Sequence, residues 1–141
     1  MIVAALPAYN EEIAIGSVIL RARKHADKVI VVDDGSEDNT AEIAELAGAI
    51  VFKHERNMGY GAAIRSCFRK ARELNADILV TIDADGQHDP SEIPKLIEPI
   101  QKGEADVVIG SRFLSKQKYP IPLYRLLGMK VLDKTTNFFL D

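Results

Sequence analysis

The sequence has one cysteine, no excess of basic charge and no long apolar run, and each of these limits the class of protein. A single cysteine among 141 residues cannot form an intrachain disulfide, so nothing indicates an oxidising compartment. The 18 Lys and Arg residues stand against 21 Asp and Glu, giving a net charge of −3. This balance argues against nucleic-acid binding through bulk basic charge.

The longest stretch without a charged residue is Met1–Asn10. It is far shorter than the roughly 18 apolar residues that a membrane-spanning helix needs. It also lacks the basic segment that begins a signal peptide. We therefore expect a cytoplasmic protein, and peripheral contact with the inner face of the membrane stays open.

Short apolar runs alternate with segments of helical periodicity along the chain. The expected strands are Ile2–Leu6, Val29–Val32, Ala49–Phe52, Ile78–Ile82 and Val107–Ile109. The apolar stripes expected on helices are Ile15, Val18, Ile19 and Ala22; Ile43, Ala44 and Ala47; and Ile64, Cys67, Phe68, Ala71 and Leu74. This alternation predicts a single α/β domain with a mainly parallel sheet and right-handed crossovers.

Two later segments depart from that regular pattern. Pro94 and Pro99 conflict with one long helix, so we expect a short turn and then a helix that begins near Pro94. Residues 119–141 follow a proline break and have an amphipathic helical pattern with basic residues among the leucines. Their apolar end suggests self-association, a covering partner or the front part of a longer protein.

Polar residues gather where the expected strands end, which is where a doubly wound sheet has its ligand crevice. The segments are Pro7–Glu12, Asp33–Ser36, Asp83–His88 and Gly110–Phe113. The strongest is Asp83-Ala84-Asp85, because carboxylates at i and i+2 of an extended segment share a side and repel each other without a cation. Oxygen ligands suit Mg²⁺ or Mn²⁺, and Gln87 could add another. The alternative is an acidic loop that caps the next helix.

The other clusters each allow a structural alternative. Asp33 and Asp34 suit recognition of a ribose or base, or else a turn in which Ser36 or Asp38 caps the next helix. Tyr9 could stack on a base beside Glu11, whereas Asn10 could simply cap the first helix.

Three further features carry weaker signals. The glycines of Arg56–Ala63 could let a ligand approach a helix N-terminus or could form a turn. Arg112 could hold a diphosphate or lie on the surface. His88 is expected either beside the site or facing solvent rather than as a ligand, and Cys67 as a buried, inert thiol.

Taken in order, these motifs resemble the family-2 glycosyltransferases of GT-A fold, in particular the dolichyl-phosphate mannose and polyprenyl-phosphate glucose synthases. The motifs are Pro7–Glu11, Val32–Ser36, Arg56–Gly61, Asp83–His88 and Gly110–Phe113. The resemblance implies a Rossmann-like three-layer α/β/α fold, with residues 1–113 as a donor-binding core and 119–141 as an amphipathic helical tail. It also implies that Pro7, Tyr9, Glu11, Val32, Asp34, Asp83, Ala84, Asp85, Gln87 and Arg112 bind the nucleotide sugar.

Within that set the resemblance assigns Asp83, Asp85 and Gln87 to a Mg²⁺ or Mn²⁺ ion, and catalysis to Asp85 and Arg112. The implied reaction transfers a hexose, with inversion, from a GDP- or UDP-sugar to a polyprenyl or dolichyl phosphate. The family continues into an Asp-x-x-Ser-Gly-Phe-type segment that this sequence lacks. The alternatives are therefore an incomplete or non-catalytic nucleotide-sugar-binding module and a transferase with a saccharide acceptor.

Two other classes fit the motif order less well. A sugar-1-phosphate nucleotidyltransferase would carry a glycine-rich basic loop after its first strand, where Pro7–Glu11 stands. A receiver domain would carry its acidic pair after the first strand rather than at Asp33 and Asp34, with a lysine after the last strand.

Overall fold

The structure is a computed structural model that describes residues 1–111. The chain divides into two compact units, Met1–Val108 and Ile109–Asp141. The first unit carries every element described below. Arg112 and the predicted helical tail at 119–141 lie outside the described residues, so both stay predictions.

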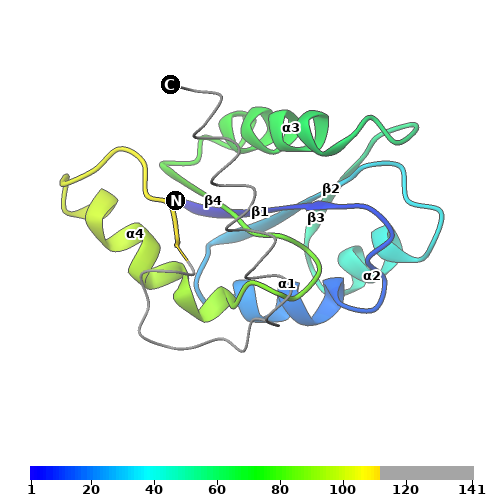
Figure 1. The fold of residues 1–141 in the computed structure, drawn as a ribbon, viewed down its shortest axis with the longest axis horizontal. Coiled ribbons are helices and arrows are strands. Elements are labelled where there is room, and N and C mark those ends of the chain that lie inside the picture. Colours follow the sequence, from blue (N-terminus) through cyan, green and yellow to red (C-terminus); the bar gives the residue numbers. More distant parts are fainter. Residues whose placement is uncertain (112–141) are drawn as a thin grey trace, which may run out of the picture. The chain divides into compact units, whose positions relative to one another are not determined.

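Four parallel strands form the central sheet (Figure 1). They are β1 (Ile2–Ala8), β2 (Lys28–Asp33), β3 (Ile50–Lys53) and β4 (Ile78–Thr81), in the order β3-β2-β1-β4. In the register, Ala8 lies opposite Asp33, and Asp33 lies opposite Lys53. The carboxyl ends of β1, β2 and β3 therefore meet at one edge, which brings the residues that follow them together.

Helices cover both faces of this sheet (Figure 1). They are α1 (Ile15–Ala22), α2 (Thr40–Leu46), α3 (Tyr60–Glu73), a 3₁₀ turn η1 (Pro90–Glu92) and α4 (Ile93–Gln101). Alternate strand residues separate two apolar clusters: Val3, Ala5, Ile30 and Val32 pack with α3, while Ala4, Leu6, Val29 and Val31 pack with α1, α2 and α4. The predicted three-layer α/β/α arrangement is confirmed.

Two local predictions hold, one for the buried face of α1 and one for the start of α4. All four residues of the predicted α1 stripe are buried. The turn η1 precedes α4, which begins at Ile93 with Pro94 in its first turn, where a missing N–H costs little. Gly48 follows α2 at φ +86°, a conformation that glycine adopts without strain. Within residues 1–111 no helix is both long and apolar enough to cross a membrane.

The predicted fifth strand at Val107–Ile109 is wrong for the described chain, because these residues pair with no strand of the four-stranded sheet. Val107 and Ile109 are 75% and 85% exposed, so the run gains little from burial. Three apolar residues alone do not offset the entropy of ordering an edge strand. The predicted α3 stripe also errs at Phe68, which is 60% exposed, while Cys67 and Ala71 carry the buried face.

Cys67 is buried between α3 and the sheet, and we predict that it resists modification in the folded protein. Burial raises the pKa of the Cys67 thiol to about 12, so almost no reactive thiolate exists at neutral pH. Ellman's reagent should therefore label the chain stoichiometrically in denaturant, but only at the rate of unfolding in its absence. Rapid labelling of native protein, with its circular dichroism spectrum unchanged, would contradict this packing.

Candidate functional site

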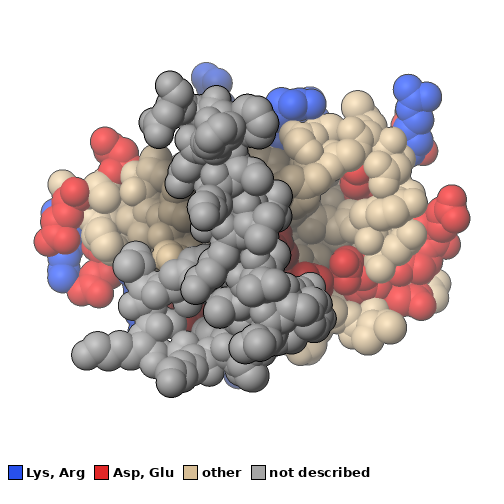
Figure 2. Space-filling view, in the orientation of Figure 1, with Lys and Arg blue, Asp and Glu red and all other residues tan. Residues whose placement is uncertain are grey.

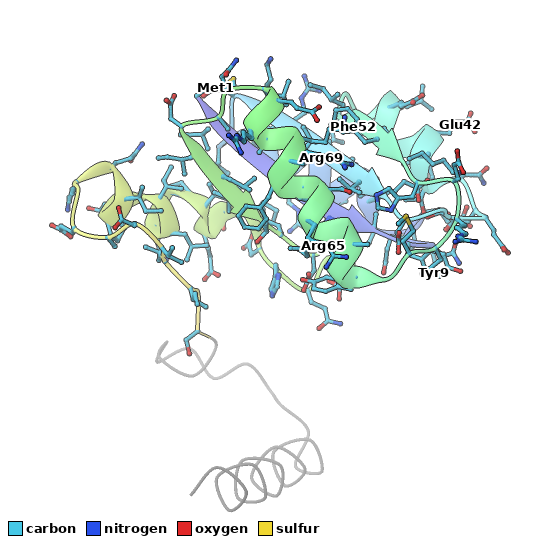
Figure 3. All side chains as sticks on the ribbon, turned by 90° about the horizontal axis from the view of Figure 1, so that it is seen from above. Met1, Tyr9, Glu42, Phe52, Arg65 and Arg69 are labelled. Atoms are coloured by element: carbon cyan, nitrogen blue, oxygen red, sulfur yellow. The ribbon has the colours of Figure 1, made fainter. Side chains whose placement is uncertain are left out.

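A cavity of about 390 Å³ opens at the carboxyl edge of the sheet, between the loops after β1, β2 and β4 and the start of α3. Its lining residues are Pro7, Ala8, Tyr9, Glu11, Asp34, Asn57, Gly59, Tyr60, Ala63, Asp83, Ala84 and Asp85. Seven of the ten residues predicted to bind a ligand therefore converge on one space. In Figure 3, Tyr9 lies at the end of the sheet opposite Met1, near the end of α3 where the helix begins.

The loop after β1 is tied to the loop after β2. The Asn10 N–H donates to the Ser36 Oγ at 2.9 Å, and the Glu37 N–H donates to the Asn10 Oδ1 at 2.9 Å. Asn10 adopts φ 55°, a left-handed conformation that asparagine tolerates. The alternative in which Asn10 caps the first helix is therefore wrong, because its side chain bonds across to the neighbouring loop.

Glu11 is held in this loop by its backbone and faces other acids with its side chain. Its N–H donates to the Thr40 Oγ1 at 2.8 Å. Burial, followed by the charges of Asp85, Asp38 and Asp83, raises the pKa of the Glu11 carboxyl. Figure 2 shows acidic side chains gathered on the right, over the loops at this end of the sheet. The cavity mouth is therefore a region of negative potential that favours a cation.

The two aspartates at the end of β2, Asp33 and Asp34, make different contacts. Asp33 is fully buried, accepts the Ser36 N–H at 2.9 Å and lies 3.3 Å from the Lys53 Nζ, so it supports the turn. Asp34 continues β2 by donating its N–H to the Ala8 carbonyl, and its side chain lines the cavity. The predicted turn is therefore present at Asp33, whereas the carboxylate of Asp34 lies at the cavity wall.

Asp34 occupies the N-terminus of α3. Its Oδ1 accepts the Met58 N–H at 3.0 Å, and its Oδ2 accepts the Gly59 N–H at 2.8 Å. Burial raises the pKa of Asp34, but hydrogen bonds from His54, Met58 and Gly59 outweigh burial and lower it below the ordinary value. The amides that the glycine-containing loop offered to a ligand are therefore taken by Asp34, and the loop contributes Gly59 to the cavity wall instead.

Asp83 and Asp85 both line the cavity, although not as alternate residues of a strand. β4 ends at Thr81, and Asp85 lies in a turn in which its Oδ1 accepts the Gln87 N–H at 2.8 Å. The Asp83 Oδ1 receives the Tyr60 hydroxyl at 3.4 Å, and its Oδ2 lies 3.5 Å from the His88 Nδ1. His88 therefore lies next to a carboxylate of the cavity wall.

The carboxylates at the cavity suit a metal ion that keeps some of its coordination positions open for other ligands. In the described chain, no three His, Cys, Asp or Glu side chains form a group that could hold a metal ion. Mg²⁺ is commonly held by one or two carboxylates and takes its other ligands from phosphate and water. Asp83 and Asp85, two carboxylates on one open cavity, match that pattern.

Two predicted residues of the described chain, Val32 and Gln87, are not on the cavity wall. Val32 is fully buried in the apolar layer beneath α3. Gln87 is exposed and contributes its backbone N–H to Asp85, while Arg112 lies outside the described residues. Their assignment to the donor and the metal stays a prediction.

Several residues in or behind the cavity wall were not predicted from the sequence. Asn57 and Ala63 line the cavity, while His54 and Ser66 lie behind Asp34 without lining it. His54 directly follows β3, as Asp34 follows β2. Pairing those two strands in register would have placed the histidine beside the aspartate.

The sequence profile of glycosyl transferase family 2 matches residues 4–135, which is most of the chain. The chain belongs to glycosyl transferase family 2. It is 40% identical to the UDP-N-acetylglucosamine–dolichyl-phosphate N-acetylglucosaminyltransferase of Methanococcus voltae, over 87% of this chain and 57% of that protein. It is 37% identical to the undecaprenyl-phosphate mannosyltransferase of Micrococcus luteus, over 76% of this chain and 46% of that protein.

Solved structures agree with this family membership. Glucosyl-3-phosphoglycerate synthase from Mycobacterium tuberculosis, in complex with Mn²⁺, UDP-glucose and phosphoglyceric acid, aligns with a TM-score of 0.61 at 35% identity. The alignment covers 74% of this chain and 40% of that chain. The chain therefore has the GT-A fold. It spans about half the length of the curated relatives named above.

Proposed function

We propose that the protein is a metal-dependent inverting transferase that moves a hexose from a GDP- or UDP-sugar to a polyprenyl phosphate. The observation that carries this proposal is the convergence of Tyr9, Glu11, Asp34, Asp83 and Asp85 on one cavity at the carboxyl edge of the sheet. An aromatic ring, a carboxylate with hydrogen-bonding capacity and an acidic pair are the groups that a base, a ribose and a metal-bound diphosphate require.

The nucleoside end of the donor is assigned to the loops after β1 and β2. Tyr9 is 43% exposed at the cavity wall, so its ring face is available for stacking on a base. Asp34 is anionic at neutral pH and accepts N–H or O–H groups only. A uracil or guanine ring offers N–H donors, and the ribose hydroxyls offer O–H donors.

The diphosphate end is assigned to the turn after β4. Asp83 and Asp85 would hold Mg²⁺ or Mn²⁺, with Gln87 as a further ligand and Arg112 near the phosphates. A bound divalent ion neutralises charge that develops on the departing diphosphate. The Gln87 N–H keeps Asp85 in its turn, and the Tyr60 hydroxyl restrains Asp83, so both carboxylates are oriented before a donor arrives.

The acceptor is proposed to be a lipid phosphate because such a group is already anionic. Its oxygen attacks the anomeric carbon, the bond from that carbon to the diphosphate oxygen breaks, and the nucleoside diphosphate departs with the electron pair. The attack needs no strong general base, whereas a saccharide hydroxyl would need one. The relatives from Methanococcus voltae and Micrococcus luteus are named for dolichyl and undecaprenyl phosphate acceptors, which supports this choice.

The test is a transfer assay with the chain, Mn²⁺, radiolabelled UDP- and GDP-hexoses, and either a short-chain polyprenyl phosphate or a saccharide acceptor. We expect label in the organic-soluble prenyl phosphate product and none in the saccharide. NMR of the product should show that the anomeric configuration is inverted relative to the donor. Label transferred only to the saccharide would refute the proposed acceptor. Donor binding without transfer to either would indicate a nucleotide-sugar-binding module.

A further inference from the structure

The carboxylate of Asp34 is held from behind by His54. The His54 Nδ1 lies 2.6 Å from the Asp34 Oδ1, and the two side chains are only 13% and 5% exposed. The His54 N–H donates to the Asp33 carbonyl at 2.8 Å, which continues the β2–β3 pairing by one residue. The pairing of β2 with β3 therefore fixes the backbone of both residues and places their side chains next to each other.

The far side of the imidazole is fixed as well. The His54 Nε2 lies 2.9 Å from the Ser66 Oγ, on the buried side of α3. The Arg69 Nη2 donates to the same Ser66 oxygen at 3.3 Å. Arg69 lies one turn further along α3 (Figure 3). A line of hydrogen bonds thus runs from the helix, through the ring, to the carboxylate.

The direction of the bond between His54 and Asp34 follows from its acceptor. An ionised carboxylate only accepts hydrogen bonds, so the His54 Nδ1–H donates to the Asp34 Oδ1. The Ser66 Oγ holds the other ring nitrogen in place. An Asp–His–Ser set also occurs in hydrolases. Here the serine is buried and the aspartate faces the cavity, so the set presents a carboxylate rather than a nucleophile.

The acceptor capacity of Asp34 is nearly used up. Each carboxylate oxygen accepts about two hydrogen bonds. Oδ1 has two donors, His54 and Met58, while Oδ2 has the Gly59 N–H. One acceptor position therefore remains on Oδ2 of a side chain that lines the cavity.

We propose that His54, fixed by Ser66, is a positioning residue that holds Asp34 so that its Oδ2 accepts one hydrogen bond from the nucleoside of the donor. This inference rests on the proposed function, because it takes the cavity as the donor site. Neither His54 nor Ser66 lines that cavity. Their effect on the ligand is therefore transmitted through Asp34, and it is confined to the nucleoside end.

The test compares the binding of UDP or GDP with that of Mn²⁺-pyrophosphate by titration calorimetry. His54→Leu removes the hydrogen bond, and His54→Asn restores a donor near the position of Nδ1. We expect His54→Leu to weaken binding of the preferred nucleoside diphosphate about tenfold, the loss of one hydrogen bond to a charged group. Binding of Mn²⁺-pyrophosphate should stay within about twofold, and His54→Asn should recover most of the loss.

A double-mutant cycle with Asp34→Asn identifies the route of the effect. If His54 acts through Asp34, His54→Leu has no further effect on nucleotide affinity once Asp34 is asparagine. Ser66→Ala, which leaves both the ring and the cavity wall in place, should weaken nucleotide binding about threefold and serves if His54→Leu fails to fold. His25→Asn is the matched control, and wild-type affinity is expected.

The outcomes separate the two proposals. Equal losses for the nucleotide and for Mn²⁺-pyrophosphate, or additive effects in the cycle, would overturn the positioning role while leaving the donor site intact. So would nucleotide affinity that is unchanged in both His54→Leu and Ser66→Ala. Wild-type protein that binds neither nucleotide would overturn the proposed function, and this inference with it.

Discussion

Replacing Asp85 by asparagine is expected to weaken Mn²⁺-dependent binding of the nucleotide sugar by about 100-fold, equivalent to ~2.7 kcal/mol. The variant removes one of two carboxylates proposed to hold the metal. Asparagine keeps an Oδ1 that can accept the Gln87 N–H, so the turn is preserved. Calorimetric titration of the donor with and without Mn²⁺ measures the effect, and metal-free affinity should change little.

A charge-matched control distinguishes a local from a general electrostatic effect. Glu45→Gln removes one exposed negative charge on α2, which does not line the cavity, so its donor affinity should equal that of the wild type. If Asp85→Asn binds the Mn²⁺ donor as tightly as Glu45→Gln does, Asp85 is not a metal ligand and the assignment of this turn fails.

Alanine at Gly35 is expected to destabilise the protein by about 3 kcal/mol or more, through both strain and overpacking. Gly35 adopts φ +75°, and a Cβ there would lie 2.5 Å from the Arg56 carbonyl carbon and 2.7 Å from the Asn57 nitrogen. Those contacts are backbone atoms, which cannot rotate away. The loops after β2 and β3 would have to separate, and that would disturb the Asp34 contacts with Met58 and Gly59. Urea unfolding measures the loss.

Gly103 provides the control for conformation alone. It adopts φ +71°, close to that of Gly35, but a Cβ there meets nothing within 4 Å. Gly103→Ala should therefore cost only the left-handed backbone strain, about 1 kcal/mol. Similar losses in the two variants would show that the close approach of the loops at Gly35 contributes nothing to stability.

The layers of the fold could be predicted because burial and periodicity agree in them. The runs at 2–6 and 29–32 are apolar on both faces, and the α1 stripe is buried at every predicted position. Val107–Ile109 is apolar like the observed strands but is shorter than any of them and pairs with no strand. Pairing of that kind is a tertiary property that a three-residue pattern does not encode.

In the site, too, positions that follow a strand could be predicted from the sequence, whereas contacts between neighbouring loops could not. Tyr9, Asp34, Asp83 and Asp85 could be placed because each follows a recognisable strand. The bond from Asn10 to the next loop and the contact of His54 with Asp34 could not, because both depend on how neighbouring strands pair. The order of the motifs in the sequence was enough to place these residues at one edge of the sheet. Predicting the hydrogen bonds between them requires the register in which the strands pair.

The most direct measurement is an NMR titration of ¹⁵N-labelled chain with UDP or GDP in the presence of Mg²⁺, repeated with traces of Mn²⁺. We predict that one nucleotide shifts the amide signals of Tyr9, Asp34 and Gly59, which belong to residues on the cavity wall. Paramagnetic Mn²⁺ is expected to broaden the signals of Asp83, Asp85 and Gln87 first. Shifts and broadening elsewhere, or none in a folded sample with either nucleotide, would contradict a metal–nucleotide site in this cavity.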